Sequence, residues 1–248
     1  MTRPPPGLAL GFHAVRTALE EHPRRVERLL LARGRRDQRT RRLVELARRS
    51  KVPFQQVPKD ALDRLAGGVR HQGVAARLAG TELLTADELM ERLPARPLVV
   101  VADGVTDPRN LGAIARSAAA FGADGLFLPG HRSAGLGPAA VRTAAGAFEL
   151  LPVARAGNVG RLLERLDELG VEPVALDPAG GVAPWEAELA GGVAIVAGGE
   201  EQGVRRSVLD RCRVRISIPI REAVGSLNVS VAVGIVLADL ARRRHETT

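Results

Sequence analysis

The sequence predicts an α/β protein in two parts: a small amino-terminal α/β domain and a larger three-layer α/β domain with a mostly parallel sheet. The chain has 248 residues, enough for one large domain or two small ones. From residue 98 onward, short apolar runs alternate with helical patterns, as is typical of strands covered by helices on both faces. An excess of basic residues is confined to the first third of the chain, which indicates that this third is a separate module.

Residues 1–77 are expected to form the smaller domain, with a proline-rich start at 1–7. Leu43, Leu46 and Ala47 lie on one side of a helical pattern and arginines on the other, which predicts an amphipathic helix over 39–49. The other expected elements are helices at 13–22 and 59–65 and strands at 26–31, 52–57 and 73–77. Residues 78–96 are expected to form a linker with one short helix at 85–92.

Residues 97–248 are expected to form the larger domain. The continuous apolar run at 98–102 is typical of a strand buried in a parallel sheet. Further strands are expected near 125–128, 150–154, 172–176, 193–197 and 214–218. Helices are expected at 111–121, 138–145, 158–169 and 228–243. Strands that alternate with helices in this way predict a sheet between two layers of helices.

The composition excludes several classes of protein. The only cysteine, Cys212, excludes an internal disulfide and a cysteine-based zinc site. The five histidines are scattered along the chain, and we expect no metal. Apolar stretches such as 231–237 are too short to cross a membrane, and the amino terminus has no signal-peptide core. We therefore expect a soluble cytoplasmic protein without a membrane partner.

The positive charge is unevenly distributed. Residues 1–80 hold 18 Lys and Arg against 7 Asp and Glu, a net charge of +11, whereas residues 81–248 hold 18 against 21, a net charge of −3. A solvated basic face in an arginine-rich proteome is one explanation, but it leaves the confinement to the first third unexplained. A module that binds nucleic acid explains it better. With only six aromatic residues, base stacking is disfavoured and arginine–phosphate contacts are expected.

The first motif, DGVTDPRNLGAIARS at 103–117, follows a predicted strand. Its loop carries Asp103, Asp107 and Asn110 beyond the carboxyl end of that strand, where open α/β sheets bind ligands. Asn110 is also a plausible cap for the next helix. Arg116 lies in an otherwise small and apolar helical segment, which favours a functional role over a merely solvated position.

Two further motifs follow later strands. GGEEQGVRR at 198–206 combines glycines, which let the backbone approach a ligand closely, with Glu200. ISIPIREAVGSLNVSV at 216–231 places Ser226 and Asn228, both good N-cap residues, before the last predicted helix. A glycine turn or a helix cap alone explains each motif singly, but not why all three would lie at the same edge of the sheet.

Together, in this order and spacing, the motifs resemble the SpoU-type family of SPOUT RNA 2′-O-ribose methyltransferases, with the closest likeness to members that act on a guanosine of bacterial 23S rRNA. The resemblance covers essentially the whole chain, with an RNA-binding domain over 7–77 and the catalytic domain over 97–248. It implies a trefoil knot in the carboxyl-terminal part, a homodimer, and S-adenosyl-methionine bound against 198–203, 216–220 and 225–228. The residues expected to contact the cofactor are Gly198, Gly199, Gly203, Ile218, Ile220 and Leu227.

The reaction implied is methyl transfer to a ribose 2′-hydroxyl, which must lose its proton around the transition state. The catalytic candidates are Arg116, Asn110, Glu200, Ser226 and Asn228. A guanidinium has no acceptor and stays protonated. We therefore expect Arg116 to hold an RNA phosphate and to stabilise the developing alkoxide, while a phosphate oxygen or another side chain takes the proton.

The substrate that the resemblance implies is a guanosine in 23S rRNA. A tRNA or another rRNA is the alternative within the same reaction class, because the catalytic motifs do not separate them. A non-catalytic RNA-binding or ribosome-assembly protein is the alternative from another class. The sequence has no P-loop, and its first loop lacks the glycines of a Rossmann-type methyltransferase.

Overall fold

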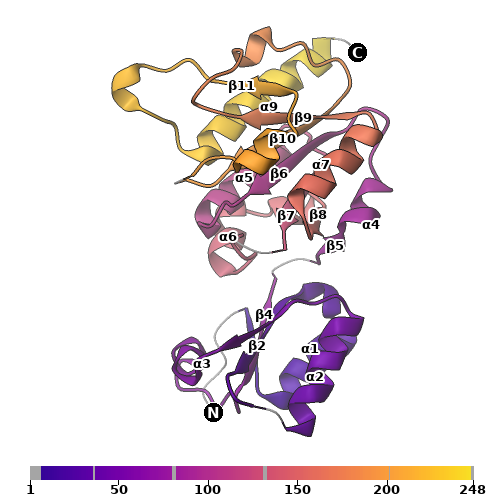
Figure 1. Cartoon of the computed structure of the whole chain (residues 1–248), viewed down its shortest axis with the longest axis vertical. Coiled ribbons are helices and arrows are strands. Elements are labelled where there is room, and N and C mark those ends of the chain that lie inside the picture. Colours follow the sequence, from indigo (N-terminus) through magenta and orange to yellow (C-terminus); the bar gives the residue numbers. More distant parts are fainter. Residues whose placement is uncertain (1–6, 36, 80–81, 131–132, 201, 247–248) are drawn as a thin grey trace. The chain divides into compact units, whose positions relative to one another are not determined.

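The structure is a computed structural model that describes residues 7–35, 37–79, 82–130, 133–200 and 202–246. The chain divides into two compact units (Figure 1). The first comprises residues 1–83 with 135–138, and the second comprises 84–134 with 139–248. Both are α/β, as the sequence predicts.

The first unit contains a four-stranded sheet in the order β1-β4-β2-β3. Strand β4 pairs antiparallel with β1 and β2, and β3 pairs parallel with β2. The strands are β1 (Leu8–Leu10), β2 (Val26–Ala32), β3 (Phe54–Val57) and β4 (Val74–Leu78). The helices are α1 (Phe12–Glu21), α2 (Gln38–Arg49) and α3 (Lys59–Ala66), with a short 3-10 turn η1 (Pro23–Arg25).

Figure 1 shows α1 and α2 on one side of this sheet and α3 on the other. Val15 and Leu43 are buried with Leu29 on the first side, and Leu62 is buried with Leu30 on the second. Helix α2 begins one residue before the predicted start at 39, because the carboxylate of Asp37 accepts the backbone N–H of Thr40 at 2.9 Å and caps it. The short strand β1 was not predicted, since three residues show too little alternation to indicate a strand.

The second unit is built on a seven-stranded sheet in the order β11-β9-β10-β6-β7-β8-β5. Every strand pair in it is parallel, so the expectation of a mostly parallel sheet is confirmed. The strands are β5 (Leu84–Thr85), β6 (Leu98–Asp103), β7 (Gly125–Pro129), β8 (Val153–Ala156), β9 (Val171–Leu176), β10 (Gly192–Gly198) and β11 (Val214–Ile216).

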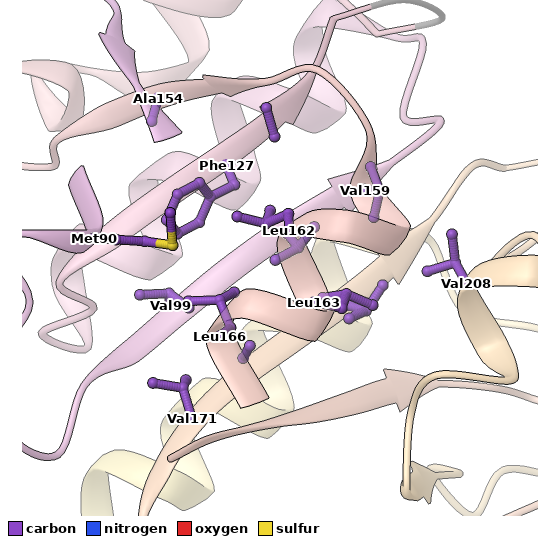
Figure 2. Packing of buried hydrophobic residues seen from close by; sticks show 14 of the residues in the cluster. Met90, Val99, Phe127, Ala154, Val159, Leu162, Leu163, Leu166, Val171 and Val208 are labelled. Atoms are coloured by element: carbon purple, nitrogen blue, oxygen red, sulfur yellow. The ribbon is translucent and has the colours of Figure 1, made fainter. Parts of the chain in front are cut away.

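Helices lie on both faces of this sheet. They are α4 (Ala86–Met90), α5 (Pro108–Ala120), α6 (Pro138–Ala144), α7 (Val159–Glu168), α8 (Arg206–Leu209) and α9 (Val229–Glu246), with 3-10 turns η2 (Ala147–Glu149), η3 (Pro184–Glu186) and η4 (Glu222–Val224). Helices α4, α7 and α8 pack on the face that carries Val99 and Phe127, and Figure 2 shows Leu162 and Leu163 of α7 directed at this layer. Helices α5 and α9 pack against each other and against β6 and β10.

Several boundaries differ from the sequence prediction. Asp107 caps α5 through the backbone N–H of Arg109 at 2.8 Å, and Pro108 occupies the first turn. Asn110 therefore lies inside the helix and is not its cap. The strand predicted at 214–218 ends at 216, before the proline-containing segment. The short helix expected at 85–92 is present as α4, but it and β5 belong to the second unit and not to a linker, and Leu89 is fully buried there.

Candidate active site

A cavity of about 630 Å³ lies beyond the carboxyl ends of β9 and β10 in the second unit. Residues from four stretches of chain line it, which are 176–179, 198–200 with 202–204, 216–220 and 226–232. The lining side chains and backbone come mainly from small and aliphatic residues, with carboxylates from Asp177 and Glu200. Its size falls within the range of cavities that enclose small-molecule ligands.

The predicted cofactor residues all line this cavity. They are Gly198, Gly199, Gly203, Ile218, Ile220 and Leu227. Three of the predicted catalytic residues also line it, namely Glu200, Ser226 and Asn228. The cavity thus brings together the second and third motifs, which are separated by two elements of secondary structure in the chain.

Glycines close the loop that follows β10 at its base. Gly199 and Gly203 exchange two backbone hydrogen bonds, of 2.9 and 3.2 Å, and Gly203 has a φ of +62°, which favours glycine. A Cβ on Gly198 would lie 2.0 Å from the carbonyl carbon of Gly203, and a Cβ on Gly199 would lie 2.4 Å from the oxygen of Gly104. Any residue larger than glycine at position 198 or 199 would therefore require the backbone to shift.

A chain of hydrogen bonds joins all three motifs. Asn110 donates through Nδ2 to Oε1 of Glu200 at 2.6 Å and accepts through Oδ1 from Nδ2 of Asn228 at 3.0 Å. Asn228 precedes α9 and accepts from the backbone N–H of Ser230 at 2.9 Å, which confirms it as the helix cap. Ser226 is exposed on the loop before this cap. The polar side chains of the first, second and third motifs therefore meet at one edge of the sheet.

Arg116 lies on α5, nearly two helical turns after Asn110. Its side chain is exposed, and within the part of the chain that the structure describes it has no hydrogen-bond or ion-pair partner. Neither Arg116 nor Asn110 lines the cavity itself. The guanidinium is thus available to a ligand from solvent, outside the enclosed pocket.

Asp103 does not occupy the position expected from the sequence. Its carboxylate is fully buried and accepts from the backbone N–H of Arg205 at 3.1 Å and from its guanidinium Nε at 2.9 Å. This hydrogen bonding raises the pKa of Arg205. The sequence predicted that Asp103 would lie where a ligand binds beyond the strand end, whereas in the structure it pairs with Arg205 of the loop after β10.

The wall formed by 176–179 was not predicted. Asp177 comes directly after the end of β9. Ligands bind beyond the carboxyl ends of parallel strands, so this rule would have indicated Asp177 as a site residue. Its carboxylate accepts the backbone N–H of Ala179 at 2.9 Å, and Arg215 lies 3.6 Å away. This wall therefore presents a partly buried acidic group to the cavity.

No group of three or more His, Cys, Asp or Glu side chains in the described ranges is arranged to hold a metal ion.

Cys212 is buried, and burial raises the pKa of its thiol to about 12. None of the helices in these ranges is both long and apolar enough to cross a membrane.

A parallel α/β sheet with a glycine-lined cavity beyond its strand ends defines the class of this protein, an α/β enzyme that binds a small-molecule cofactor. The SpoU rRNA Methylase family matches residues 97–238, and the RNA 2′-O ribose methyltransferase substrate-binding family matches residues 8–83. The chain belongs to the SpoU rRNA methylase family.

Curated relatives resemble the chain over nearly its full length. The 23S rRNA (guanosine-2′-O-)-methyltransferase RlmB of Pseudomonas putida is 37% identical over 94% of this chain and 95% of its own, and that of Pseudomonas syringae is 39% identical over 94% of each. Among solved structures, the SpoU methyltransferase AviRb from Streptomyces viridochromogenes, in complex with the cofactor AdoMet, is 26% identical with a TM-score of 0.61. That match covers 96% of this chain and 89% of AviRb.

Proposed function

We propose that this protein transfers a methyl group from S-adenosyl-methionine to the ribose 2′-hydroxyl of a guanosine in 23S rRNA. The observation that carries the proposal is the hydrogen-bonded chain of Asn110, Glu200 and Asn228 beside the glycine-lined cavity. Relatives that are 37–39% identical over 94% of the chain carry this activity in their names and support the choice of substrate.

The residues present fit the cofactor. A cavity of about 630 Å³ accommodates a nucleoside with an amino-acid tail, and the glycines at 198 and 199 leave the backbone open to close contact. Ile218 and Leu227 would pack on its apolar parts, while backbone groups of the loops would hold its polar parts. When bound, the cofactor supplies a methyl group on a positively charged sulfur, ready for attack by an oxygen nucleophile.

The side chains of the chain would prepare that oxygen. Arg116 would bind the phosphate next to the target ribose and stabilise the alkoxide as the hydroxyl loses its proton. Glu200 is the one proposed catalytic residue with a carboxylate, which can accept the hydroxyl proton. Asn110 fixes the orientation of that carboxylate by a hydrogen bond. As the new oxygen–carbon bond formed, the bond from the methyl carbon to sulfur would break and leave S-adenosylhomocysteine, and the hydroxyl proton would pass to Glu200 or to a phosphate oxygen. Asn228 orients Asn110, and Ser226 would contact the ribose from the cavity edge.

Residues 1–77 would bind the RNA, and residues 97–248 would carry out catalysis. In the first unit helix α2 carries five arginines and a single acidic residue, Glu45, a net charge of +4. Helix α1 is different, because its Arg16 is paired with Glu20. Helix α3 holds two basic and two acidic residues. The match of residues 8–83 to a substrate-binding family supports the same division.

We also propose a trefoil knot, in which the carboxyl-terminal segment passes through the loop between Val182 and Ile216. Pairing of these two residues, with the N–H of Ser217 2.9 Å from the oxygen of Val182, closes that loop and supports the proposal. A crystal structure traced through residues 182–246 tests it. An unthreaded chain there would refute the knot.

A homodimer is proposed because α9, which follows the proposed catalytic residue Asn228, exposes Val231 and Ile235, at 49% and 37% of their surface. Light scattering at micromolar concentration would give twice the chain mass of 26.3 kDa for a dimer. A cytoplasmic location follows from the proposed substrate, since ribosomal RNA is made and assembled there.

The experiment that tests the function supplies methyl-labelled S-adenosyl-methionine with unmodified 23S rRNA, 16S rRNA or tRNA in parallel reactions. Label in 23S rRNA alone is the expected result. Label in tRNA or 16S rRNA would keep the reaction and change the substrate. RNA binding without label in any of the three would favour a non-catalytic RNA-binding protein.

A further inference from the structure

Asp103 is a charged group in a place where charge is costly. It ends β6, and its side chain has no exposed surface. An unpaired carboxylate there would lose several kcal/mol of solvation. The two carboxylates that line the cavity, Asp177 and Glu200, are at least partly exposed, so the complete burial of Asp103 requires a reason.

The partner of Asp103 is Arg205, at the far end of the loop that follows β10. The carboxylate accepts the backbone N–H of Arg205 at 3.1 Å and its Nε at 2.9 Å, and it also accepts Nη2 at 2.5 Å. This is a fork-shaped contact that only a guanidinium can make. The Arg205 side chain is 43% exposed, whereas the Asp103 side chain is fully buried, so the loss of solvation falls mainly on the carboxylate.

The Asp103–Arg205 pair connects the end of β6 to the end of the loop that follows β10. Gly198, the last residue of β10, lies directly beside Asp103 in the register of β6 and β10. The chain leaves the sheet at Gly199, passes Glu200 at the cavity, and returns to Asp103 at Arg205. The loop is thus closed twice, by the Gly199–Gly203 backbone pair and by the Asp103–Arg205 pair.

We propose that Asp103 and Arg205 are positioning residues that hold the loop after β10, described at 199–200 and 202–204, in the shape that binds the cofactor. This inference rests on the proposed function, because the loop lines the cavity assigned to the cofactor. Neither residue lines that cavity, so both act through the loop. A loop held in place before binding loses less conformational freedom on binding, and this preorganisation raises affinity.

The test substitutes Arg205→Lys, which keeps the charge and the backbone N–H but loses the fork. Its matched control is Arg206→Lys on the neighbouring residue, whose ion pair with Asp210 is exposed on α8. A second control, Leu98→Ala, removes a fully buried side chain at the start of β6, at the end of the strand opposite to Asp103, and lowers stability by a general route.

Two readouts are used, and the first requires no cofactor. Hydrogen exchange of the Gly199 and Gly203 amides is expected to be faster in Arg205→Lys and unchanged in Arg206→Lys. Calorimetry with S-adenosylhomocysteine is expected to show a Kd raised about 10- to 100-fold in Arg205→Lys, as for loss of a charged hydrogen bond. Arg205→Ala is expected to show the larger effect of the two.

Unchanged exchange and unchanged Kd in Arg205→Lys would overturn the proposal. So would an equal rise in Kd in Leu98→Ala at the same loss of melting temperature, since the effect would then be general destabilisation. Failure of the wild-type protein to bind S-adenosylhomocysteine would contradict the proposed function instead, and the exchange measurement would still decide whether the pair holds the loop.

Discussion

The Nδ2 of Asn110 lies 2.6 Å from Oε1 of Glu200, although 90 residues separate them in the chain. The contact arises because β6 and β10 are neighbours in the parallel sheet, so the segments that leave their carboxyl ends emerge side by side. The amide of Asn110 can donate to a carboxylate and accept from Asn228 at the same time. It therefore fixes the orientation of Glu200, one of the two groups that we propose as proton acceptor.

Asn110→Ala is expected to lower the rate of methyl transfer about 100-fold, the scale seen when one orienting or stabilising donor is removed from an active site. The cofactor Kd should stay within about twofold, because Asn110 does not line the cavity. Single-turnover kinetics and calorimetry separate the two quantities. A wild-type rate in Asn110→Ala would show that orientation of Glu200 does not matter.

Arg116→Lys tests the role of the guanidinium. Lysine keeps the positive charge but cannot make the planar two-pronged contact with a phosphate. We expect turnover at saturating RNA to fall on the order of 10-fold or more, and Arg116→Ala to lose more. Arg109→Lys, exposed in the first turn of the same helix, is the control. Nearly full turnover in Arg116→Lys would mean that only its charge is needed.

The arginines of α2 are expected to contact RNA phosphates. Arg42→Ala and Arg49→Ala together should weaken RNA binding and reduce the slope of log K against log salt by about 0.7–0.9 for each phosphate that is no longer neutralised. Methyl transfer at saturating RNA should be unchanged. Arg161→Ala, exposed on α7 of the catalytic unit, is the control for simple loss of charge. An equal salt slope in the α2 variant and the control would place the RNA elsewhere.

Asp37 makes the first unit sensitive to acid. The hydrogen bond from the Thr40 backbone, and then that from Arg35, lower the pKa of Asp37 from 3.8 to about 2. A lowered pKa in the folded state stabilises the protein above the unfolded value, and this contribution is lost as the pH falls from about 4 towards 2.

Asp37→Asn is therefore expected to show a smaller decrease in the free energy of unfolding across that pH interval than the wild type. Urea titrations at several pH values measure it. The same pH dependence in both proteins would mean that the Asp37 carboxylate contributes nothing to the stability of α2.

The strands of the larger sheet could be predicted from the sequence because buried strands appear there as continuous apolar runs. The continuous apolar run at 98–102 is typical of a strand covered on both faces, and β6 lies at the centre of the sheet. Helix ends were harder to predict. Asp107 and Asn110 are both good caps, and local sequence does not show which of them the backbone uses.

Long-range pairing explains the remaining differences. Asp103 and Asp107 look alike in the sequence, since both follow an apolar strand, yet Asp103 turns inward to meet Arg205, 102 residues later. The edge strand β5 has two residues and no detectable pattern, so it becomes visible only through its pairing with β8. The polar residues of the three motifs could be predicted to share one edge, but their order in the hydrogen-bonded chain could not.

The most direct test of the proposed function maps the methylated nucleotide by mass spectrometry after unmodified 23S rRNA is incubated with the protein and S-adenosyl-methionine. Wild-type protein is expected to give a single 2′-O-methylguanosine, and Glu200→Gln, which still accepts from Asn110 but takes up a proton poorly, is expected to give it far more slowly. Methylation on a base, or no methylation of any RNA by the wild-type protein, would contradict the proposed function.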